Sequence, residues 1–208
     1  MYLVFGLGNP GPRYEGTRHN IGFMAIARLA ERSNVSMERT RFSAKIGTGT
    51  LGSESVLFAC PQTYMNLSGE SVAKAASFFR VDPAGILVIH DELDLPFGTI
   101  RVKKGGGVAG HKGLKSIVQA LGDPGFIRIR FGIGRPSGRR SVVDYVLSRF
   151  DKEEEDALPS YLEELADVVE LVIREGVSAA MRRVNIRAKA GHESKSPDKE
   201  AGSGAFSV

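Results

Sequence analysis

The stretch that decides the fold is Tyr2-Leu3-Val4-Phe5-Gly6-Leu7-Gly8-Asn9-Pro10-Gly11, and Thr17-Arg18-His19-Asn20 follows it closely. The apolar run at residues 2–5 predicts a buried strand, and the glycines after it permit a backbone that approaches another group closely. Asn9 offers an amide that both donates and accepts hydrogen bonds, and His19 offers a titratable imidazole where a helix is expected to begin. We therefore expect a functional site, and not merely a turn, after this strand.

The glycines at positions 6, 8 and 11 also fit the G-x-G-x-x-G fingerprint of dinucleotide-binding proteins. That fingerprint requires a helix to begin inside the glycine run, so that the helix N-terminus meets the pyrophosphate. Here Pro10 and Pro12 flank Gly11, and helical periodicity resumes only near Asn20. Nucleotide binding is therefore the less favoured interpretation of this loop.

A second apolar run, Ile86-Leu87-Val88-Ile89, is typical of a central strand buried on both faces, and it leads into His90-Asp91-Glu92-Leu93-Asp94. In open α/β sheets ligands bind at the carboxyl edge of the strands. A carboxylate at that edge can hydrogen-bond a histidine from another loop, fix its tautomer and raise its basicity. His19 precedes a predicted helix at 21–33, whose dipole disfavours protonation of the imidazole.

The remaining periodicity predicts alternating strands and helices. Further strands are expected at 42–50, 55–59, 99–103 and 126–131, and further helices at 68–80, 114–121, 141–150, 151–175 and 178–189. This order predicts a single α/β domain at residues 1–190, with a twisted, mixed and largely parallel β-sheet flanked by helices. Polar residues dominate from Gly191 onward, so residues 191–208 are expected to form a disordered polar tail.

Composition excludes several classes of protein. The 208 residues suit one domain, and no apolar run approaches the roughly 20 residues of a membrane span. The only cysteine, Cys60, cannot form an internal disulfide, so a cytoplasmic chain without membrane association is expected. No G-x-S-x-G motif indicates a serine hydrolase. The four histidines and the carboxylates near Asp91 lack the spacing of a known metal site, so neither metal nor cofactor is expected.

The net charge of +4 conceals a segregation of charge along the chain. Residues 101–140 hold ten Lys or Arg and one acid, whereas residues 151–175 hold ten acids and two basic residues. Two solvated faces would explain this pattern, but a basic block that is rich in glycine favours a nucleic-acid partner. Within that block, the segment 103–113 is a candidate lid or phosphate-contacting loop, and a flexible solvent loop is the alternative.

Five motifs in register resemble bacterial peptidyl-tRNA hydrolases: Gly-Leu-Gly-Asn-Pro-Gly at 6–11, Thr-Arg-His-Asn at 17–20, Tyr-Met-Asn-Leu-Ser-Gly at 64–69, His-Asp-Glu-Leu-Asp at 90–94 and Gly-Ile-Gly at 132–134. The resemblance extends from Tyr2 to about Arg187. It implies a monomeric α/β enzyme, without metal or cofactor, that hydrolyses the ester between a peptide and the terminal ribose of tRNA. The implied partner is peptidyl-tRNA, held by its acceptor end and phosphate backbone, and the implied role is to recycle tRNA from aborted translation.

The resemblance also implies a role for individual residues. His19 matches the general base for water, and Asp91 matches the carboxylate that stabilises its basic form. Asn9 matches the residue that distinguishes peptidyl-tRNA from aminoacyl-tRNA with a free amine, and Asn66 can donate to the developing oxyanion. Contacts with the peptide or the tRNA are expected from Tyr14, Tyr64, Asn66, Lys103, His111, Lys112 and Arg130.

One position departs from the family pattern. The glycine loop of the family usually reads Gly-His-Asn-Gly, whereas this chain reads Gly110-His111-Lys112-Gly113. Lysine only donates hydrogen bonds and carries a charge, so it cannot supply the acceptor that asparagine would. A noncatalytic, RNA-binding relative of the family is the second hypothesis. The joint presence of Asn9, His19, Asn66 and Asp91 favours the enzyme.

Overall fold

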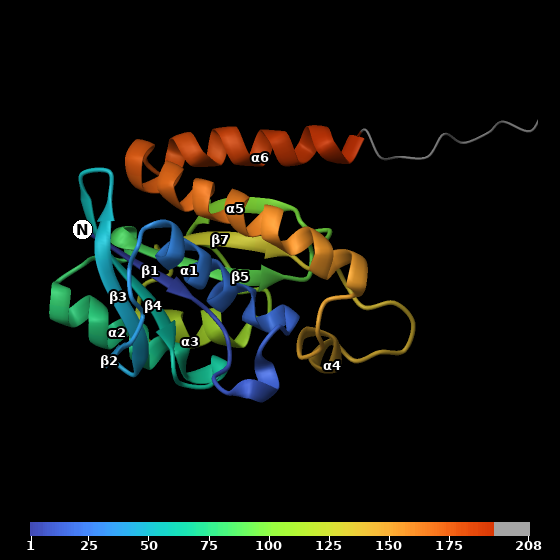
Figure 1. Cartoon of the computed structure of the whole chain (residues 1–208), viewed down its shortest axis with the longest axis horizontal. Coiled ribbons are helices and arrows are strands. Elements are labelled where there is room, and N and C mark those ends of the chain that lie inside the picture. Colours follow the sequence, from blue (N-terminus) through green and yellow to red (C-terminus); the bar gives the residue numbers. More distant parts are fainter. Residues whose placement is uncertain (194–208) are drawn as a thin grey trace, which may run out of the picture.

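A seven-stranded β-sheet forms the centre of the molecule, and helices cover both of its faces (Figure 1). The computed structural model describes residues 1–193, and within them the strands run in the order β2-β3-β4-β1-β5-β7-β6. The strands are β1 (Tyr2–Gly6), β2 (Arg39–Arg41), β3 (Ala44–Leu51), β4 (Glu54–Pro61), β5 (Ile86–Glu92), β6 (Ile100–Lys104) and β7 (Ile127–Gly132). The α-helices are α1 (Ile21–Arg32), α2 (Ser68–Phe79), α3 (Lys112–Leu121), α4 (Val142–Val146), α5 (Lys152–Glu175) and α6 (Val177–Glu193).

The sheet is mixed, and its centre is parallel. β1 pairs in parallel with β4 on one side and with β5 on the other, and β5 pairs in parallel with β7. β3 is antiparallel to β2 and β4, and β6 is antiparallel to β7. Every residue of β5 is buried, as expected for a continuous apolar run in a central strand. The predicted α/β class, with a mixed sheet between helices, is confirmed.

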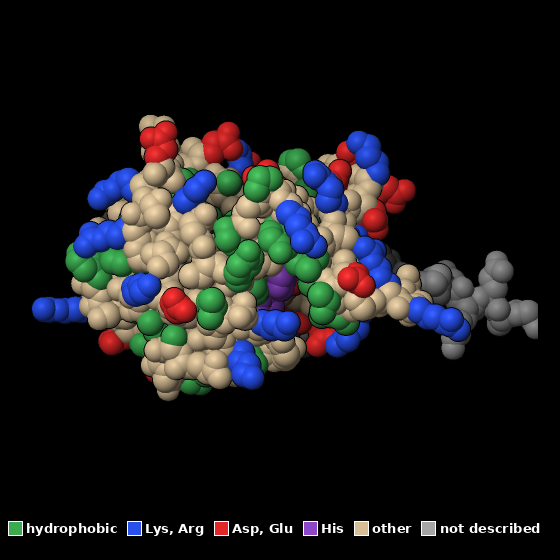
Figure 2. Space-filling view, turned by 90° about the horizontal axis from the view of Figure 1, so that it is seen from below, with side chains coloured by type: hydrophobic (Ala, Val, Ile, Leu, Met, Phe, Trp, Pro, Cys, Tyr) green, Lys and Arg blue, Asp and Glu red, His purple; other side chains and the backbone are tan. Residues whose placement is uncertain are grey.

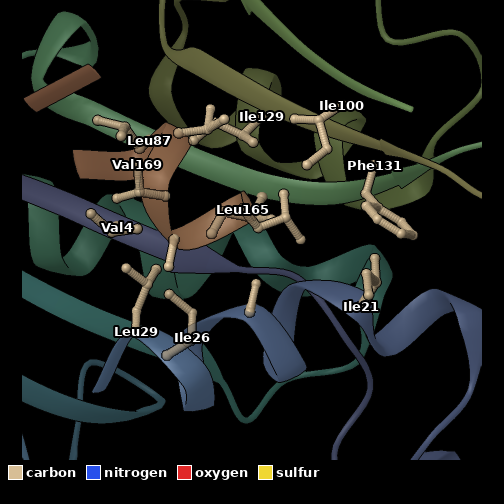
Figure 3. Close-up of a cluster of buried hydrophobic side chains, with 14 of the residues drawn as sticks. Val4, Ile21, Ile26, Leu29, Leu87, Ile100, Ile129, Phe131, Leu165 and Val169 are labelled. Atoms are coloured by element: carbon tan, nitrogen blue, oxygen red, sulfur yellow. The ribbon is translucent and has the colours of Figure 1, made fainter. Parts of the chain in front are cut away.

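Two apolar clusters hold the helices against the sheet. The first lies between one face of the sheet and α1, α5 and α6, and Figure 3 shows Val4 and Leu87 from the strands beside Ile26 from α1 and Leu165 from α5. The second cluster lies on the opposite face, where α2 and α3 pack. Leu3 and Val4 are consecutive but belong to different clusters, because successive side chains of a strand point to opposite faces.

The first helix packs unusually close to the sheet because two glycines face each other. A Cβ on Gly6 would lie 2.0 Å from the carbonyl oxygen of Gly22, and a Cβ on Gly22 would lie 2.3 Å from the amide nitrogen of Leu7. These distances are far inside van der Waals contact, so both positions require glycine. The close packing brings the 3₁₀ turn that precedes α1, η2 (Arg18–Asn20), into contact with β5.

The carboxyl ends of β1 and β5 meet where the chain reverses its direction across the sheet. After β1 the chain builds strands on the β4 side, and after β4 it crosses to the β5 side. The amide of Leu7 donates to the carbonyl oxygen of Ile89 at 2.9 Å, so the two following segments are adjacent. Such a crossover point is where open α/β sheets bind ligands.

One strand was not predicted from the sequence, and one helix is shorter than predicted. β2 carries no apolar pattern, since all three of its residues are exposed at the edge of the sheet. The helix predicted at 141–150 ends at Val146. It stops there because residues 148–149 leave the helical path and form backbone hydrogen bonds and a β-bridge with residues 17–18.

The C-terminal helix runs further than predicted. A helix was expected at 178–189 and the end of the domain at residue 190, whereas α6 continues to Glu193. The predicted boundary between domain and tail falls inside this helix, and it stays a prediction. Most of the predicted polar tail, residues 194–208, lies outside the described residues.

Candidate active site

His19 and Asp91 form a hydrogen-bonded pair at the carboxyl edge of the sheet. His19 lies in η2 just before α1, and Asp91 lies near the end of β5. Nδ1 of His19 is 2.8 Å from Oδ1 of Asp91, and the carboxylate side chain is only 3% exposed. The carboxylate therefore selects the tautomer with the proton on Nδ1, which leaves the lone pair of Nε2 free to accept a proton.

A second histidine bonds to the same carboxylate oxygen. Nε2 of His111 is 3.2 Å from Oδ1 of Asp91. Nδ1 of His111 accepts hydrogen bonds from the backbone amides of Gly113 and Leu114, at 3.1 and 3.3 Å, and so caps the N-terminus of α3. Because Nδ1 is an acceptor, the proton of neutral His111 is on Nε2 and is donated to Asp91. His19 and His111 are thus held in opposite tautomers.

The surroundings of Asp91 keep it ionised. Burial by itself would raise the pKa of this carboxyl, but the charge of His19 and the hydrogen bonds from His111 and His19 lower the pKa well below its ordinary value. An ionised carboxylate can stabilise the positive charge that His19 acquires when it accepts a proton. The pair is therefore suited to general-base chemistry.

His90, the residue before Asp91, has a different environment. Its Nδ1 donates to the backbone carbonyl oxygen of Asp91 at 2.7 Å, and its ring packs edge-on against His111 with the ring centroids 4.9 Å apart. Burial, together with the nearby His111, lowers the pKa of His90 to about 3. His90 is therefore neutral at physiological pH and packs behind the site.

Asn9 presents a hydrogen-bond donor to the same region. Its Oδ1 accepts from the amide of Met65 at 2.8 Å. Its backbone amide donates to Oδ1 of Asn20, whose Nδ2 donates back to the carbonyl oxygen of Asn9. Within the described part of the chain the amide nitrogen of Asn9, Nδ2, has no acceptor. This leaves two N–H groups on a rigidly held and almost buried side chain.

The loop before α2 carries two exposed side chains. Asn66 lies in the 3₁₀ turn η3 (Met65–Leu67), and Tyr64 immediately precedes it with 57% of its surface exposed. Figure 2 shows a histidine surface at the bottom of a hollow that is bordered by hydrophobic side chains and by lysine or arginine side chains. The histidine surface at the bottom of the hollow is therefore open to a substrate.

The basic residues that were predicted to contact tRNA differ in how exposed they are. Lys103 and Lys112 are exposed, whereas Arg130 is half-buried and donates to Glu92 at 2.9 Å. Arg128, two residues earlier on β7, is buried and donates to the carbonyl oxygens of residues 106–107. Part of the basic block therefore fixes the glycine loop instead of facing solvent. Tyr14 is half-buried in the 3₁₀ turn η1 (Pro12–Tyr14).

A family model for peptidyl-tRNA hydrolase matches residues 3–194 of the chain. The peptidyl-tRNA hydrolase of Chloroflexus aurantiacus is 47% identical over 186 residues, which cover 89% of this chain and 99% of that protein. The peptidyl-tRNA hydrolase of Rhodococcus opacus is 52% identical over 184 residues, which cover 88% and 97%. The chain belongs to the peptidyl-tRNA hydrolase family.

The fold agrees with a solved member of the peptidyl-tRNA hydrolase family. The crystal structure of the enzyme from Acinetobacter baumannii matches with a TM-score of 0.83 at 37% identity, and the match covers 89% of this chain and 94% of that one. The family resemblance read from the five motifs is therefore confirmed, and the comparisons lend no support to a noncatalytic relative. The roles of the individual residues stay predictions.

One buried residue of this peptidyl-tRNA hydrolase family member was missed as a functional candidate. The guanidinium of Arg18 is 1% exposed and pairs with Asp151 and Glu154 at the start of α5. It also donates to Ser148, and its charge lies over the ring of Tyr145 at 4.5 Å. These contacts tie η2, and with it His19, to the start of α5. The motif that contains Arg18 was visible in the sequence, but its distant partners were not.

The ligating atoms of His19, Asp91 and His111 lie within 4.8 Å of one another, a spacing that a metal ion could use. The hydrogen bonds argue against this use in a peptidyl-tRNA hydrolase. Nε2 of His111 carries a proton because Nδ1 caps α3, so ligation through Nε2 would require the cap to be broken.

None of the helices within residues 1–193 is long and apolar enough to cross a membrane.

Proposed function

We propose that this chain hydrolyses the ester bond of peptidyl-tRNA and thereby releases free peptide and tRNA. Family membership supports the substrate class. The observation that carries the chemistry is the 2.8 Å bond between Nδ1 of His19 and the buried Asp91, which leaves Nε2 of His19 available as a proton acceptor. A peptidyl-tRNA ester is activated relative to an amide, so a single general base acting on water is sufficient.

In the proposed reaction, Nε2 of His19 removes a proton from a water molecule while the water oxygen attacks the ester carbonyl carbon. The carbonyl oxygen becomes an oxyanion, to which the side-chain amide of Asn66 donates a hydrogen bond. When the tetrahedral intermediate collapses, the bond between the carbonyl carbon and the ribose oxygen breaks. The protonated His19 then returns its proton to that oxygen. No covalent enzyme intermediate forms, and general-base catalysis of this kind contributes about 10²- to 10⁴-fold.

Asp91 supports this cycle from behind His19. It accepts the Nδ1 proton and stabilises the imidazolium that forms after proton removal from water. His111 is a positioning residue in this account, because it fixes the carboxylate through the second bond to Oδ1. His111 is also proposed to contact the tRNA or the peptide, as the sequence predicts.

Asn9 supplies the selection against aminoacyl-tRNA. Because its Oδ1 is occupied by the amide of Met65, only the N–H groups of Nδ2 face the substrate. An N–H group can donate to the carbonyl oxygen of a blocked amino group, whereas a free ammonium offers only donors and carries a positive charge. The site therefore accepts acylated nitrogen and disfavours free amine.

His19, His90, Asp91 and His111 form a histidine cluster. The proposed tRNA contacts are the basic side chains beside this cluster. Lys103 and Lys112 are free to approach phosphate oxygens, and Arg130 contributes from the same side of the site. Tyr14 and Tyr64 are assigned to the acceptor end or the peptide. The proposal includes a cytoplasmic monomer that uses neither a metal nor a cofactor.

The test compares N-acetyl-aminoacyl-tRNA with the same aminoacyl-tRNA that carries a free amine. The wild-type chain is expected to cleave the first substrate and to spare the second. Asn9→Asp replaces the free donor with an acceptor of similar size and retains an oxygen for the amide of Met65, so it should lower the preference at least tenfold. Wild-type binding of both substrates without cleavage would contradict the proposal, as would an unchanged preference in Asn9→Asp.

A further inference from the structure

A second cavity lies beside the loop that carries Asn9. Its volume is about 260 Å³. The loop 9–11 forms one wall, the outward side of α1 around Phe23 and Ala27 forms another, and the facing ends of β3 and β4 close the third side. Asn9 also takes part in the proposed substrate selection, whereas the other residues named here have no role in the proposed hydrolysis.

The walls of the cavity combine apolar surface with a few polar groups. Phe23, Met37 and Cys60 are each only half-buried and face the cavity. The Cys60 thiol is a small, largely apolar group. The exposed side chains of Glu15 and Lys45 provide one negative and one positive charge. An apolar pocket with a few polar groups is typical of a site for an organic ligand.

The cavity and the histidine cluster share a rigid wall. Asn9 and Asn20 line the cavity and are locked together by two reciprocal hydrogen bonds of 2.9 and 3.0 Å. Asn20 directly follows His19 in the chain, and Asn9 bonds to Met65 next to Asn66. A peptide that extends from an ester beside His19 toward the cavity would therefore meet Asn9 first.

The order of the strands separates the cavity from the basic residues. The cavity lies on the β3–β4 side of β1, whereas Lys103 on β6 and Arg130 on β7 lie on the opposite side of β1, beyond β5. An ester held at the ends of β1 and β5 would extend its tRNA toward β7 and β6. Its peptide would then extend toward β4 and β3. The single cation in the cavity wall, balanced by Glu15, also suits a peptide better than a phosphate chain.

We propose that this cavity is a subsite for the peptide part of the substrate, and that it holds an apolar side chain of the residue that precedes the ester-linked residue. The proposal rests on the proposed hydrolysis of peptidyl-tRNA. The apolar floor formed by Phe23, Met37 and Cys60 buries that side chain, and Asn9 holds the peptide where it enters. Substrates with two or more peptide residues thus gain an interaction that a single blocked residue cannot make.

The experiment measures kcat/KM for acetyl-leucyl-glycyl-tRNA and for acetyl-glycyl-tRNA, and uses the ratio of the two values. Ala27→Phe fills the cavity from the exposed side of α1 and should lower this ratio about tenfold. The matched control is Ala84→Phe, an exposed alanine in the 3₁₀ turn η4 (Pro83–Gly85) before β5, at the opposite edge of the sheet. It should leave the ratio and the basal activity unchanged. An unchanged ratio in Ala27→Phe would overturn the proposal.

A second measurement does not depend on the folding of a variant. In wild-type protein labelled with ¹³C at the methionine methyl groups, the product acetyl-leucyl-glycine should shift the Met37 signal in a saturable way. A Met37 signal that does not move would overturn the peptide subsite. If the wild type cleaved neither tRNA substrate, the proposed hydrolysis would fail instead, and the Met37 titration would still decide whether the cavity binds a peptide.

Discussion

The histidine cluster and the basic surface beside it differ in how their polar groups are satisfied. Around Asp91, the contacts come from the chain itself: His19 and His111 bond to one carboxylate oxygen, and backbone amides hold His111. On the basic side, Lys103 and Lys112 are exposed, and their side chains form no hydrogen bond or ion pair within residues 1–193. The chemical groups are thus preorganised before substrate arrives, whereas the binding groups acquire their partners from the tRNA. Substitutions in the two regions should therefore affect different constants.

The largest effect is expected from the cluster. His19→Ala removes the general base and should lower the single-turnover cleavage rate by about 10²- to 10⁴-fold. Its affinity for tRNA should stay within a few fold of the wild type, because the imidazole acts on water. Rapid-quench cleavage and filter binding on the same preparation check both values. A near-normal single-turnover rate would remove His19 from its assigned role.

The basic surface should show the opposite pattern. Lys103→Ala should weaken tRNA binding and make the plot of log affinity against log salt shallower by about 0.9 for each lost phosphate contact. Arg130→Ala should change the slope less, because its charge is shared with Glu92. Lys152→Ala, an exposed lysine at the start of the acidic helix α5, is the matched control. Equal slopes in the wild type and in Lys103→Ala would place the tRNA elsewhere.

Part of the site was predictable from the sequence, and part of it was not. β1 and β5 were predictable because continuous apolar runs identify buried strands, and residues after such strands gather at one edge of the sheet. His19 and Asp91 could therefore be placed at the same edge from the sequence. The contact between Asp91 and His111 was not predictable, because a glycine-rich segment gives no periodicity that would reveal a helix cap at His111.

Long-range pairing explains the other differences. Arg18 bonds to Ser148, 130 residues away, and the residues around Ser148 leave the helical path that their apolar pattern indicates. The sequence of either segment alone contains no sign of the other. Arg128 and Arg130 share an alternating pattern, but burial separates their roles, and burial depends on how the glycine loop folds back over β7. Local patterns predict elements better than they predict contacts between them.

His90 should make the free energy of unfolding depend on pH. Burial, with a contribution from His111, lowers the pKa of His90 to about 3, whereas an unfolded histidine titrates near 6.5. Between these values the unfolded chain binds the additional proton, so this residue makes the free energy of unfolding rise with pH. His90→Asn keeps a donor for the carbonyl of Asp91 and removes the titration.

Denaturant unfolding at pH 6 and pH 4.5 measures this effect. The loss of stability between the two pH values should be smaller in His90→Asn than in the wild type by about 2 kcal/mol. The lowered pKa of Asp91 affects stability mainly below this window, and its contribution is the same in both proteins. Identical losses in the two proteins would mean that His90 is protonated in the folded state.

The smallest effect is expected from Lys112, where the family usually has asparagine. Its side chain is exposed at the start of α3, so solvent screens its charge. Lys112→Asn should remain active. It should move the acidic limb of the pH–rate profile slightly to higher pH, since a positive charge near His19 is lost, and it should weaken the salt dependence. If both profiles overlay the wild type, Lys112 does not act on the site.

The opposite tautomers of His19 and His111 are the central claim, and long-range ¹H–¹⁵N correlation spectra of histidine-labelled protein test it most directly. At a pH where both rings are neutral, the account predicts that His19 carries its proton on Nδ1 and His111 carries its proton on Nε2. Asp91→Asn should disturb the His19 pattern. A wild-type spectrum in which Nε2 of His19 is protonated, or in which Nδ1 of His111 is protonated, would contradict the account.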